Sequence, residues 1–285
     1  MNPYHQFVDE FARSIRTGSR CPLGNVPATS HPIVPDNAPG VLLFSPHPDD
    51  ECIISGLPLR LRRECGMRVA NVAVTQGSNP DRQDARLKEL REACDFIGYE
   101  LIQTAERGLE QINAVTRDKD PNHWRAAVDV ISELLSRRRP RIIFFPHECD
   151  WNVTHIGTHL LVRDALQRQE SGFECFVVET EYWGAMATPN LMVESTLNEV
   201  SDMVTGVSFH RGEVQRNPFH IGMPSWLHDN VRRGAELVFG QGGQAYDFLF
   251  ATLYRLSRWR QGRHERWFSE GRALPSGKTP EELFC

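Results

Sequence analysis

Short apolar runs alternate with longer amphipathic stretches along the first two thirds of the chain. The apolar runs have the length and composition of strands and fall at residues 40–45, 68–75, 100–103, 141–145 and 174–180. Between them, apolar positions recur at helical spacing in residues 52–65, 81–97, 123–136 and 155–168. Strands that alternate with helices of this length predict βαβ units and a mainly parallel sheet. The runs at 40–45 and 141–145 are apolar at nearly every position, which is typical of strands covered by helices on both faces.

This pattern divides the chain into three segments. Residues 20–40 are rich in Pro, Asn, Gly and Ser, and we expect residues 1–38 to form an irregular N-terminal extension. Residues 39–200 are expected to form a Rossmann-like α/β core. For residues 201–285 we expect a mostly helical segment that walls the site of the core. Within that segment, residues 255–268 mix basic and aromatic side chains, and we interpret them as a solvated helix face or an oligomer contact.

Composition and charge narrow the class of protein. The chain has 285 residues, of which 40% are hydrophobic and 24% charged, close to the average of globular domains. The net charge of −5, without a polybasic tail, argues against nucleic acid or anionic lipid as a partner. No apolar run approaches the roughly 18 residues that cross a bilayer, and the N-terminus lacks the apolar centre of a secretory signal. The seven cysteines are scattered, without a CxxC pair, so we interpret them as reduced thiols of a cytoplasmic protein.

Polar clusters follow two of the predicted strands without a gap. The sequence PHPDDE stands at residues 46–51, and PHECDWNVTH stands at residues 146–155. Ligands of open α/β sheets bind beyond the carboxyl ends of the strands, so both clusters are expected at one edge. His47 and Asp50 lie three residues apart in a turn and can point at one cation, and a histidine of the second cluster would supply a third ligand. Two histidines and one carboxylate leave a position open for water, which is the pattern of catalytic zinc.

A further carboxylate stands beside the predicted ligands. Zinc lowers the pKa of a bound water to about 7, and Asp49, which is not a ligand in this scheme, is placed to take the proton. The alternative interpretation is structural: a single histidine after a strand caps or lies on the surface, and the acidic run opens a solvated helix. The second cluster behind another parallel strand favours the metal site.

The hexapeptide after the first strand resembles the signature of the PIG-L/LmbE-like deacetylases, which are zinc enzymes that remove acetyl or related acyl groups from N-acylglucosamine units. Other parts of the family pattern have counterparts here, namely Thr75-Gln76-Gly77-Ser78, Arg86, Glu89, Ile97-Gly98, Pro146-His147, His155, His159, Glu181-Tyr182-Trp183 and Pro189-Asn190. The resemblance covers about residues 40–195, with a weaker echo at residues 246–248.

Carried over by position, the resemblance implies the metal centre. His47, Asp50 and His155 would be the ligands of one Zn²⁺ per chain, with Asp49 as the general base. Another divalent metal stays open as an alternative, because sites of mixed nitrogen and oxygen ligands follow metal availability as well as affinity.

The residues around the ligands receive supporting roles. Arg86 matches an arginine that contacts the sugar in related enzymes, and its alternative is a salt bridge at helical spacing with Glu89 or Glu92. We expect Asp150 to hydrogen-bond a ligand histidine from behind. His159 stands one helical turn after His155, and we expect it to support the site rather than to bind the metal.

One stretch departs from the family pattern. The second cluster commonly ends His-x-Asp-His, and the first of these histidines stabilises the oxyanion, whereas this chain has Asn152-Val153-Thr154-His155. Asn152 can still donate a hydrogen bond to an oxyanion, and loss of such a donor lowers rates about a hundredfold or more. We therefore expect Asn152 to act in catalysis and substrate binding. Thr154 cannot orient an imidazole as a carboxylate does. His147 is the candidate to replace the missing histidine as a substrate-binding residue.

Together these features predict a metal-dependent hydrolase. Its substrate would be a small molecule or glycan that carries an N-acyl amino sugar, and its products the free amine and acetate. Two alternatives stay open: a zinc amidase that acts on a non-sugar amide, and a non-catalytic binding protein that has kept a metal. The sequence does not name the group attached to the sugar, and it leaves open whether the chain forms a homo-oligomer.

Overall fold

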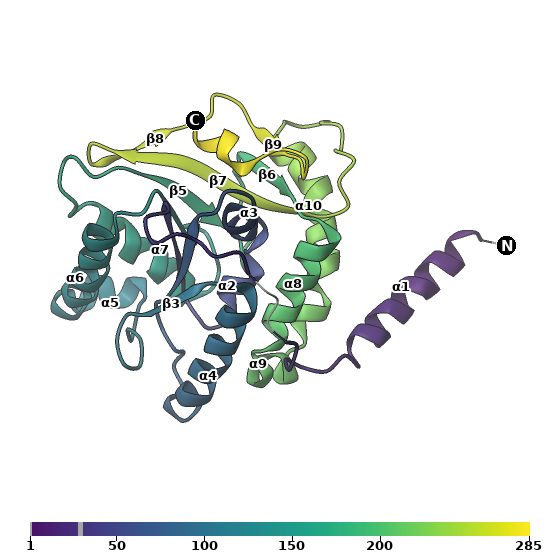
Figure 1. The fold of residues 1–285 in the computed structure, drawn as a ribbon, viewed down its shortest axis with the longest axis horizontal. Helices are drawn as coiled ribbons and strands as arrows, with labels where there is room; N and C mark the ends of the chain where they lie inside the picture. Colours follow the sequence, from purple (N-terminus) through teal and green to yellow (C-terminus); the bar gives the residue numbers. More distant parts are fainter. Residues whose placement is uncertain (1, 28–30) are drawn as a thin grey trace.

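A single mixed sheet forms the centre of the molecule in the computed structural model, which describes residues 2–27 and 31–285. Its strand order is β3-β2-β1-β4-β5-β7-β6-β9, and β8 pairs with β7 (Figure 1). The strands are β1 (Gly40–Ser45), β2 (Arg68–Ala73), β3 (Glu100–Gln103), β4 (Ile142–Pro146), β5 (Cys175–Thr180), β6 (Leu191–Glu194), β7 (Ala251–Arg260), β8 (Arg263–Arg266) and β9 (Arg272–Leu274).

Helices cover both faces of this sheet, and α1 projects away from it (Figure 1). The helices are α1 (Tyr4–Gly18), α2 (Asp50–Ile53), α3 (Gly56–Glu64), α4 (Pro80–Ile97), α5 (Ala114–Lys119), α6 (Pro121–Arg138), α7 (Val153–Leu166), α8 (Leu197–Ser208), α9 (Arg211–Arg216) and α10 (Met223–Leu237), with 3-10 turns η1 (Phe219–Ile221) and η2 (Pro280–Phe284). None of the helices within the described ranges combines the length and the apolar character that a membrane span requires.

The order of the strands places the two polar clusters side by side. Five neighbouring strands of the sheet, in the order β3, β2, β1, β4 and β5, are parallel to one another. From β1 the chain runs outward through β2 to β3 and then returns to place β4 on the other side of β1. The strand order therefore reverses between β1 and β4, and ligands of open α/β sheets bind at such a switch point. The segments after β1 and β4 are the two clusters singled out in the sequence.

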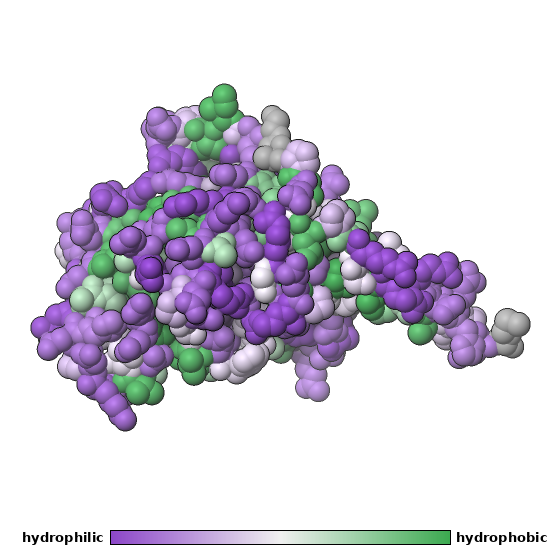
Figure 2. Space-filling view, turned by 90° about the horizontal axis from the view of Figure 1, so that it is seen from below, coloured by the Kyte–Doolittle hydropathy of each residue, from purple (hydrophilic) through white to green (hydrophobic). Residues whose placement is uncertain are grey.

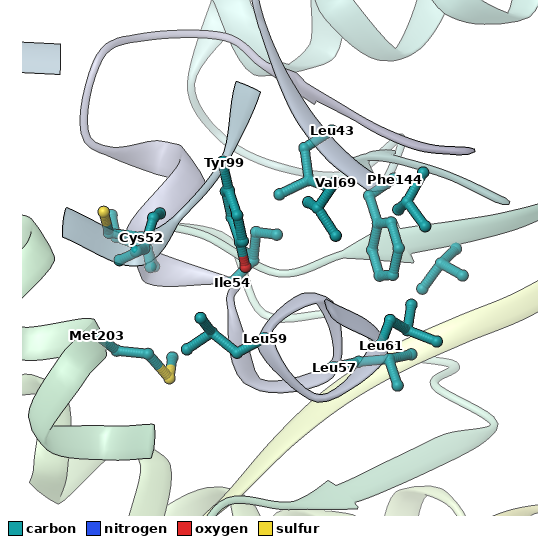
Figure 3. Close-up of a cluster of buried hydrophobic side chains, with 14 of the residues drawn as sticks. Leu43, Cys52, Ile54, Leu57, Leu59, Leu61, Val69, Tyr99, Phe144 and Met203 are labelled. Atoms are coloured by element: carbon teal, nitrogen blue, oxygen red, sulfur yellow. The ribbon is translucent and has the colours of Figure 1, made fainter. Parts of the chain in front are cut away.

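Successive residues of the central strands pack into two different cores. Val41 and Leu43 of β1 face a core built with α2, α3, α4 and α8, whereas Leu42 and Phe44 face a core built with α6 and α7. Figure 3 shows part of the first core, with Leu43 above the leucines of α3. Alternate burial on two faces is the period of a β-strand, and it explains why these strands are continuously apolar. The expected α/β fold, with a mainly parallel sheet and helices on both faces, is confirmed.

The N-terminal segment differs from the expectation. Residues 4–18 form the helix α1, so the prediction of an irregular extension was wrong for this part. Its apolar residues recur at helical spacing and are all largely exposed: Tyr4, Phe7, Val8, Phe11 and Ile15. Residues 19–27 and 31–39 contain no helix or strand, while residues 1 and 28–30 of this predicted segment lie outside the described residues. The helix projects from the body in Figures 1 and 2.

The C-terminal segment is helical only in its first half. Helices α8 to α10 extend to Leu237, but residues 251–274 contain three strands. Residues 255–268 lie in the β7–β8 hairpin, so their interpretation as a helix face was wrong. The reason is long-range pairing: β7 is hydrogen-bonded between β5 and β6. In this register Arg255 lies opposite Glu179 and the two form an ion pair, while Trp259 is buried in the second core.

Candidate metal centre

The chain turns sharply between β1 and α2. Asp49 has a φ of 116°, a backbone conformation that is strained for any residue with a Cβ atom. Its N–H donates to Glu51 Oε2 at 3.0 Å, and the N–H of His47 donates to Asp50 Oδ2 at 2.9 Å. Two carboxylates therefore hold the turn, and the side chains of His47 and Asp50 converge.

Helix α7 brings a third donor to the same point. His47 Nδ1 lies 3.2 Å from His155 Nε2, and Asp50 Oδ2 lies 3.6 Å and 3.4 Å from these two nitrogens. Ligands placed 2.0–2.1 Å from a tetrahedral zinc ion are about 3.3 Å apart, so the spacing of the three atoms fits such an ion. Asp50 Oδ1 is buried and has no hydrogen-bond partner among the described residues. The donor set suggests a divalent metal.

Asp150 lies behind His155. Its Oδ2 is 3.4 Å from His155 Nδ1, and its two oxygens accept hydrogen bonds from the backbone N–H groups of Asn152 and Gly184. Position 184 needs glycine, because a Cβ there would lie 2.7 Å from the backbone of Asp150. Burial by itself would lower the pKa of His155, but the carboxylates of Asp50 and Asp150 outweigh burial and raise this pKa to about 10.

His147 and His159 do not line the pocket. His147 Nδ1 accepts from the N–H of Cys149, and Nε2 lies 2.8 Å from the carbonyl oxygen of Gly184. Both ring nitrogens are thus used by the backbone, and the ring is buried, so the geometry contradicts the expected substrate contact of His147. His159 Nδ1 lies 3.0 Å from the carbonyl oxygen of Pro146, so it supports the end of β4 rather than a ligand residue.

A cavity of about 510 Å³ opens beside the three donors and is lined by His47, Asp49 and Asn152. Burial, and then the charge of Asp50, raises the pKa of Asp49 well above its usual range, against the opposing charges of His210 and Arg86. Asp49 therefore lies in the cavity wall and has a carboxyl group whose pKa is raised.

The two polar atoms of the Asn152 side chain differ in their contacts. Its Oδ1 accepts from the N–H of Thr154 at 2.9 Å and caps the start of α7. The structure shows no acceptor for its Nδ2 within residues 2–27 and 31–285. Since Asn152 lines the cavity, this amide nitrogen is the group that can donate a hydrogen bond to a ligand.

Arg86 also lines the cavity, and its partners differ from the expected alternative. Its Nη2 donates to the carbonyl oxygen of Pro48 at 3.1 Å, and its Nε lies 3.6 Å from Glu213 Oε1. The predicted alternative, a helix pair with Glu89 or Glu92, is not what the structure shows. Glu89 accepts from the backbone of α9, and Glu92 pairs with Arg211 there.

The sequence did not predict the pair of buried side chains, Glu51 and His210, that supports the strained turn at Asp49. Glu51 Oε1 lies 2.7 Å from His210 Nε2, and both side chains are buried. Burial would lower the pKa of His210, but Glu51 outweighs it and the pKa is raised. Glu51 does lie in the first turn of α2, as expected, yet its carboxylate also fixes Asp49. Glu51 and His210 are 159 positions apart in the sequence, so no local signal predicts this pair.

Two other groups of acids, histidines and cysteines have metal-like spacing, and their geometry has a different explanation. Glu148 and Glu179, near His159, are both bonded to Arg255. Glu51, near Cys52, is bonded to His210. Of the three groups, the one formed by His47, Asp50 and His155 adjoins the cavity.

Comparison with known proteins finds one matching family. Residues 42–166, which include both polar clusters, match the family PIG-L: GlcNAc-PI de-N-acetylase. No curated protein sequence matches the chain.

Solved structures share the fold at low identity. N,N'-diacetylchitobiose deacetylase from Pyrococcus horikoshii is 16% identical, with a TM-score of 0.57 over 92% of this chain and 96% of its own. A deacetylase of teicoplanin biosynthesis is 17% identical, with a TM-score of 0.53 over 77% and 98%. The 4-carboxy-2-hydroxymuconate hydratase from Pseudomonas putida KT2440 is 14% identical, with a TM-score of 0.55 over 76% and 95%. Because a hydratase shares the fold, the fold alone does not specify the reaction.

The family match covers the strands, the turn and the helix that bring the three donor atoms together. Residues 42–166 are therefore identified as a PIG-L domain, and this match supports an enzyme of the N-deacetylase and amidohydrolase class.

Proposed function

We propose that this protein hydrolyses an N-acetyl or related N-acyl amide of an amino sugar at a single Zn²⁺ site. The observation that carries the proposal is the convergence of His47 Nδ1, Asp50 Oδ2 and His155 Nε2 at the wall of a cavity that Asp49 also lines. A zinc ion held by these atoms would polarise the amide carbonyl and lower the pKa of a water molecule to about 7.

Asp49 moves the proton in this proposal. Its carboxylate accepts a proton from the attacking water and then gives it to the nitrogen of the leaving amine. The water oxygen first bonds to the acyl carbon, the C–N bond then breaks as the amine nitrogen is protonated, and the products are a carboxylic acid and a free amine. A raised pKa suits both steps, because a group that accepts and returns a proton works best with a pKa near the working pH.

Neighbouring side chains orient the substrate. Asn152 Nδ2 donates to the oxygen on which negative charge develops, since its Oδ1 is already used to cap α7. Arg86, which lines the same cavity, contacts the sugar part of the substrate. Trp183 and Phe219 pack edge to face, with ring centroids 5.1 Å apart, and line the same cavity, where they shield the reacting amide from water.

The first experiment combines metal analysis with acyl release. The purified protein is tested for bound metal and for acetate release from a panel of N-acetylglucosamine derivatives, alongside the variant Asp49→Ala. We expect about one zinc ion per chain in both proteins, and a loss of turnover of about 10²–10⁴-fold in the variant. Asp95→Ala is the control, because Asp95 is an exposed acid on α4.

Each outcome has a clear meaning. Full turnover in Asp49→Ala would remove Asp49 from the mechanism. Hydrolysis of non-sugar amides alone would support the amidase alternative. Zinc binding with no hydrolysis of any amide would favour the non-catalytic binding protein, and failure to bind metal after reconstitution would contradict the proposed centre.

A further inference from the structure

Three arginines gather at one side of the cavity beside the proposed metal centre. Arg82 and Arg86 stand one helical turn apart on α4, and Arg216 ends α9; all three line the cavity that contains His47 and Asp49. Helices α4 and α9 lie side by side at the lower edge of Figure 1. Seen from below, in Figure 2, the surface of the molecule is mostly hydrophilic.

One carboxylate serves all three guanidinium groups. Arg82 and Arg216 donate to Glu213 of α9, and Arg86 Nε lies 3.6 Å from the same side chain. A salt bridge between two helices needs only one arginine for each carboxylate. The excess of arginine is therefore unexplained by the packing of α4 against α9.

Most donors of these arginines have no acceptor in the protein. Three guanidinium groups present about fifteen N–H donors. Within the described ranges their hydrogen bonds number three, two to Glu213 and one from Arg86 to Pro48. Arg86 Nε is buried without a hydrogen-bond partner there. The cluster thus has donors to spare for a ligand in the cavity.

The charge at this wall is opposite to that of the whole chain. The protein has a net charge of −5, yet the three arginines face only the carboxylates of Asp49 and Glu213 among the acids that line the cavity. Even with both acids ionised, one positive charge remains in excess. Ser78 and Asn79, at the N-terminal end of α4, also line the cavity, and a helix N-terminus adds positive potential.

We propose that the substrate carries an anionic substituent, a phosphate or a carboxylate, which Arg82, Arg86 and Arg216 bind while its N-acyl group lies at the metal centre. Guanidinium groups match both oxyanions because their parallel N–H groups bond two oxygens at once. The inference rests on the proposed function and narrows its substrate to anionic N-acyl amino sugars.

The test compares substrates that differ in one charged group. Hydrolysis by the zinc-loaded protein is measured with N-acetylglucosamine, its 1-phosphate, its 6-phosphate, and N-acetylmuramic acid, which carries a carboxylate. We expect one of the anionic compounds to exceed N-acetylglucosamine at least about tenfold in kcat/KM, mainly through KM. The phosphate and carboxylate arms distinguish the two kinds of anion. Screening predicts that this preference decreases as salt is raised.

Arginine variants connect the preference to the cluster. Arg82→Gln and Arg216→Gln should each reduce the ratio of kcat/KM for the anionic over the neutral substrate about tenfold. Arg232→Gln is a matched control, because Arg232 pairs with an acid three residues earlier and is 67% exposed, as Arg216 is 69% exposed, but it does not line the cavity. If Arg216→Gln lowers Tm and leaves the ratio of kcat/KM for the anionic over the neutral substrate unchanged, the arginines only stabilise the packing of α4 and α9, and the proposal is wrong.

Binding measurements separate this inference from the proposed function. Equal rates with neutral and anionic substrates would overturn the anion site and leave the deacylase intact. If no substrate is hydrolysed, calorimetry with glucosamine 6-phosphate, glucosamine 1-phosphate and glucosamine tests the cluster directly. A preference for a phosphate that disappears in Arg216→Gln supports it, since a phosphate bound only to the metal would not depend on Arg216. No preference, or one that survives in Arg216→Gln, contradicts it.

Discussion

The carboxylate of Asp150 lies 3.4 Å from Nδ1 of His155, while Nε2 of the same ring faces His47 and Asp50. A carboxylate behind a ligand histidine fixes the tautomer and the orientation of the ring. The family pattern that the sequence resembles has an aspartate at the position of Thr154. Here Asp150, tied to the backbone of Asn152 and Gly184, stands in contact with the imidazole instead.

Asp150→Asn should weaken metal binding about 10–100-fold, because the amide holds the imidazole less strongly than the carboxylate does. Competition with a chromophoric chelator measures this affinity. Asp164→Asn, on the same helix, is the control, because Asp164 pairs with Arg117 instead. An unchanged zinc affinity in Asp150→Asn would show that the contact does not orient His155.

Asp49→Gly and Asp49→Ala should differ in stability although both lack the carboxylate. The φ of 116° at this position strains alanine but not glycine, so we expect the glycine variant to be about 1–2 kcal/mol more stable. Urea unfolding of the two variants measures the difference. Equal midpoints at equal slopes would mean that the turn relaxes once the side chain is removed.

Asn152→Ala and Asn152→Ser separate the two roles of Asn152. Both remove Nδ2, so kcat should fall about a hundredfold in each. Only the alanine variant also loses the cap of α7, and it should be about 1 kcal/mol less stable than the serine variant. Parallel kinetics and thermal unfolding test this, and a serine variant with the wild-type kcat would exclude Asn152 as an oxyanion donor.

The lowered pKa of His264 predicts that the free energy of unfolding decreases in acid. Its ring packs edge-on against Trp259, and burial, followed by the charge of Arg163, lowers its pKa to about 4 from 6.5. Below pH 6.5 the unfolded chain binds a proton that the folded chain does not, so this contribution is complete above pH 6.5 and is lost as the pH falls towards 4.

The comparison of wild type with His264→Gln measures this effect. Between pH 7.5 and about pH 4.5, the wild type should lose about 2 kcal/mol more of its unfolding free energy than the variant does. Urea titrations at both pH values give the two differences. The same loss in both proteins would show that His264 is protonated equally in the folded and unfolded chain.

Much of the core was predictable because its signals are local. The apolar runs that became β1 to β5 lie within a residue or two of the observed strands, since a strand covered on both faces must be apolar throughout. His47 and Asp50 share one turn, so their convergence follows from their spacing. The alternation of strands and helices also predicted the edge of the sheet at which the two clusters meet.

The sequence by itself thus determined the α/β core, the two polar clusters and their shared edge, because periodicity and short spacings act within a few residues. Only the tertiary structure decided that His147 turns to the backbone and that Glu51 pairs with His210. It also decided that the segment of Arg255 is a strand, because hydrogen bonds from two neighbouring strands fix the backbone there. The arginines around Glu213 come from α4 and α9. Contacts between segments far apart in the sequence depend on packing, and no local pattern encodes them.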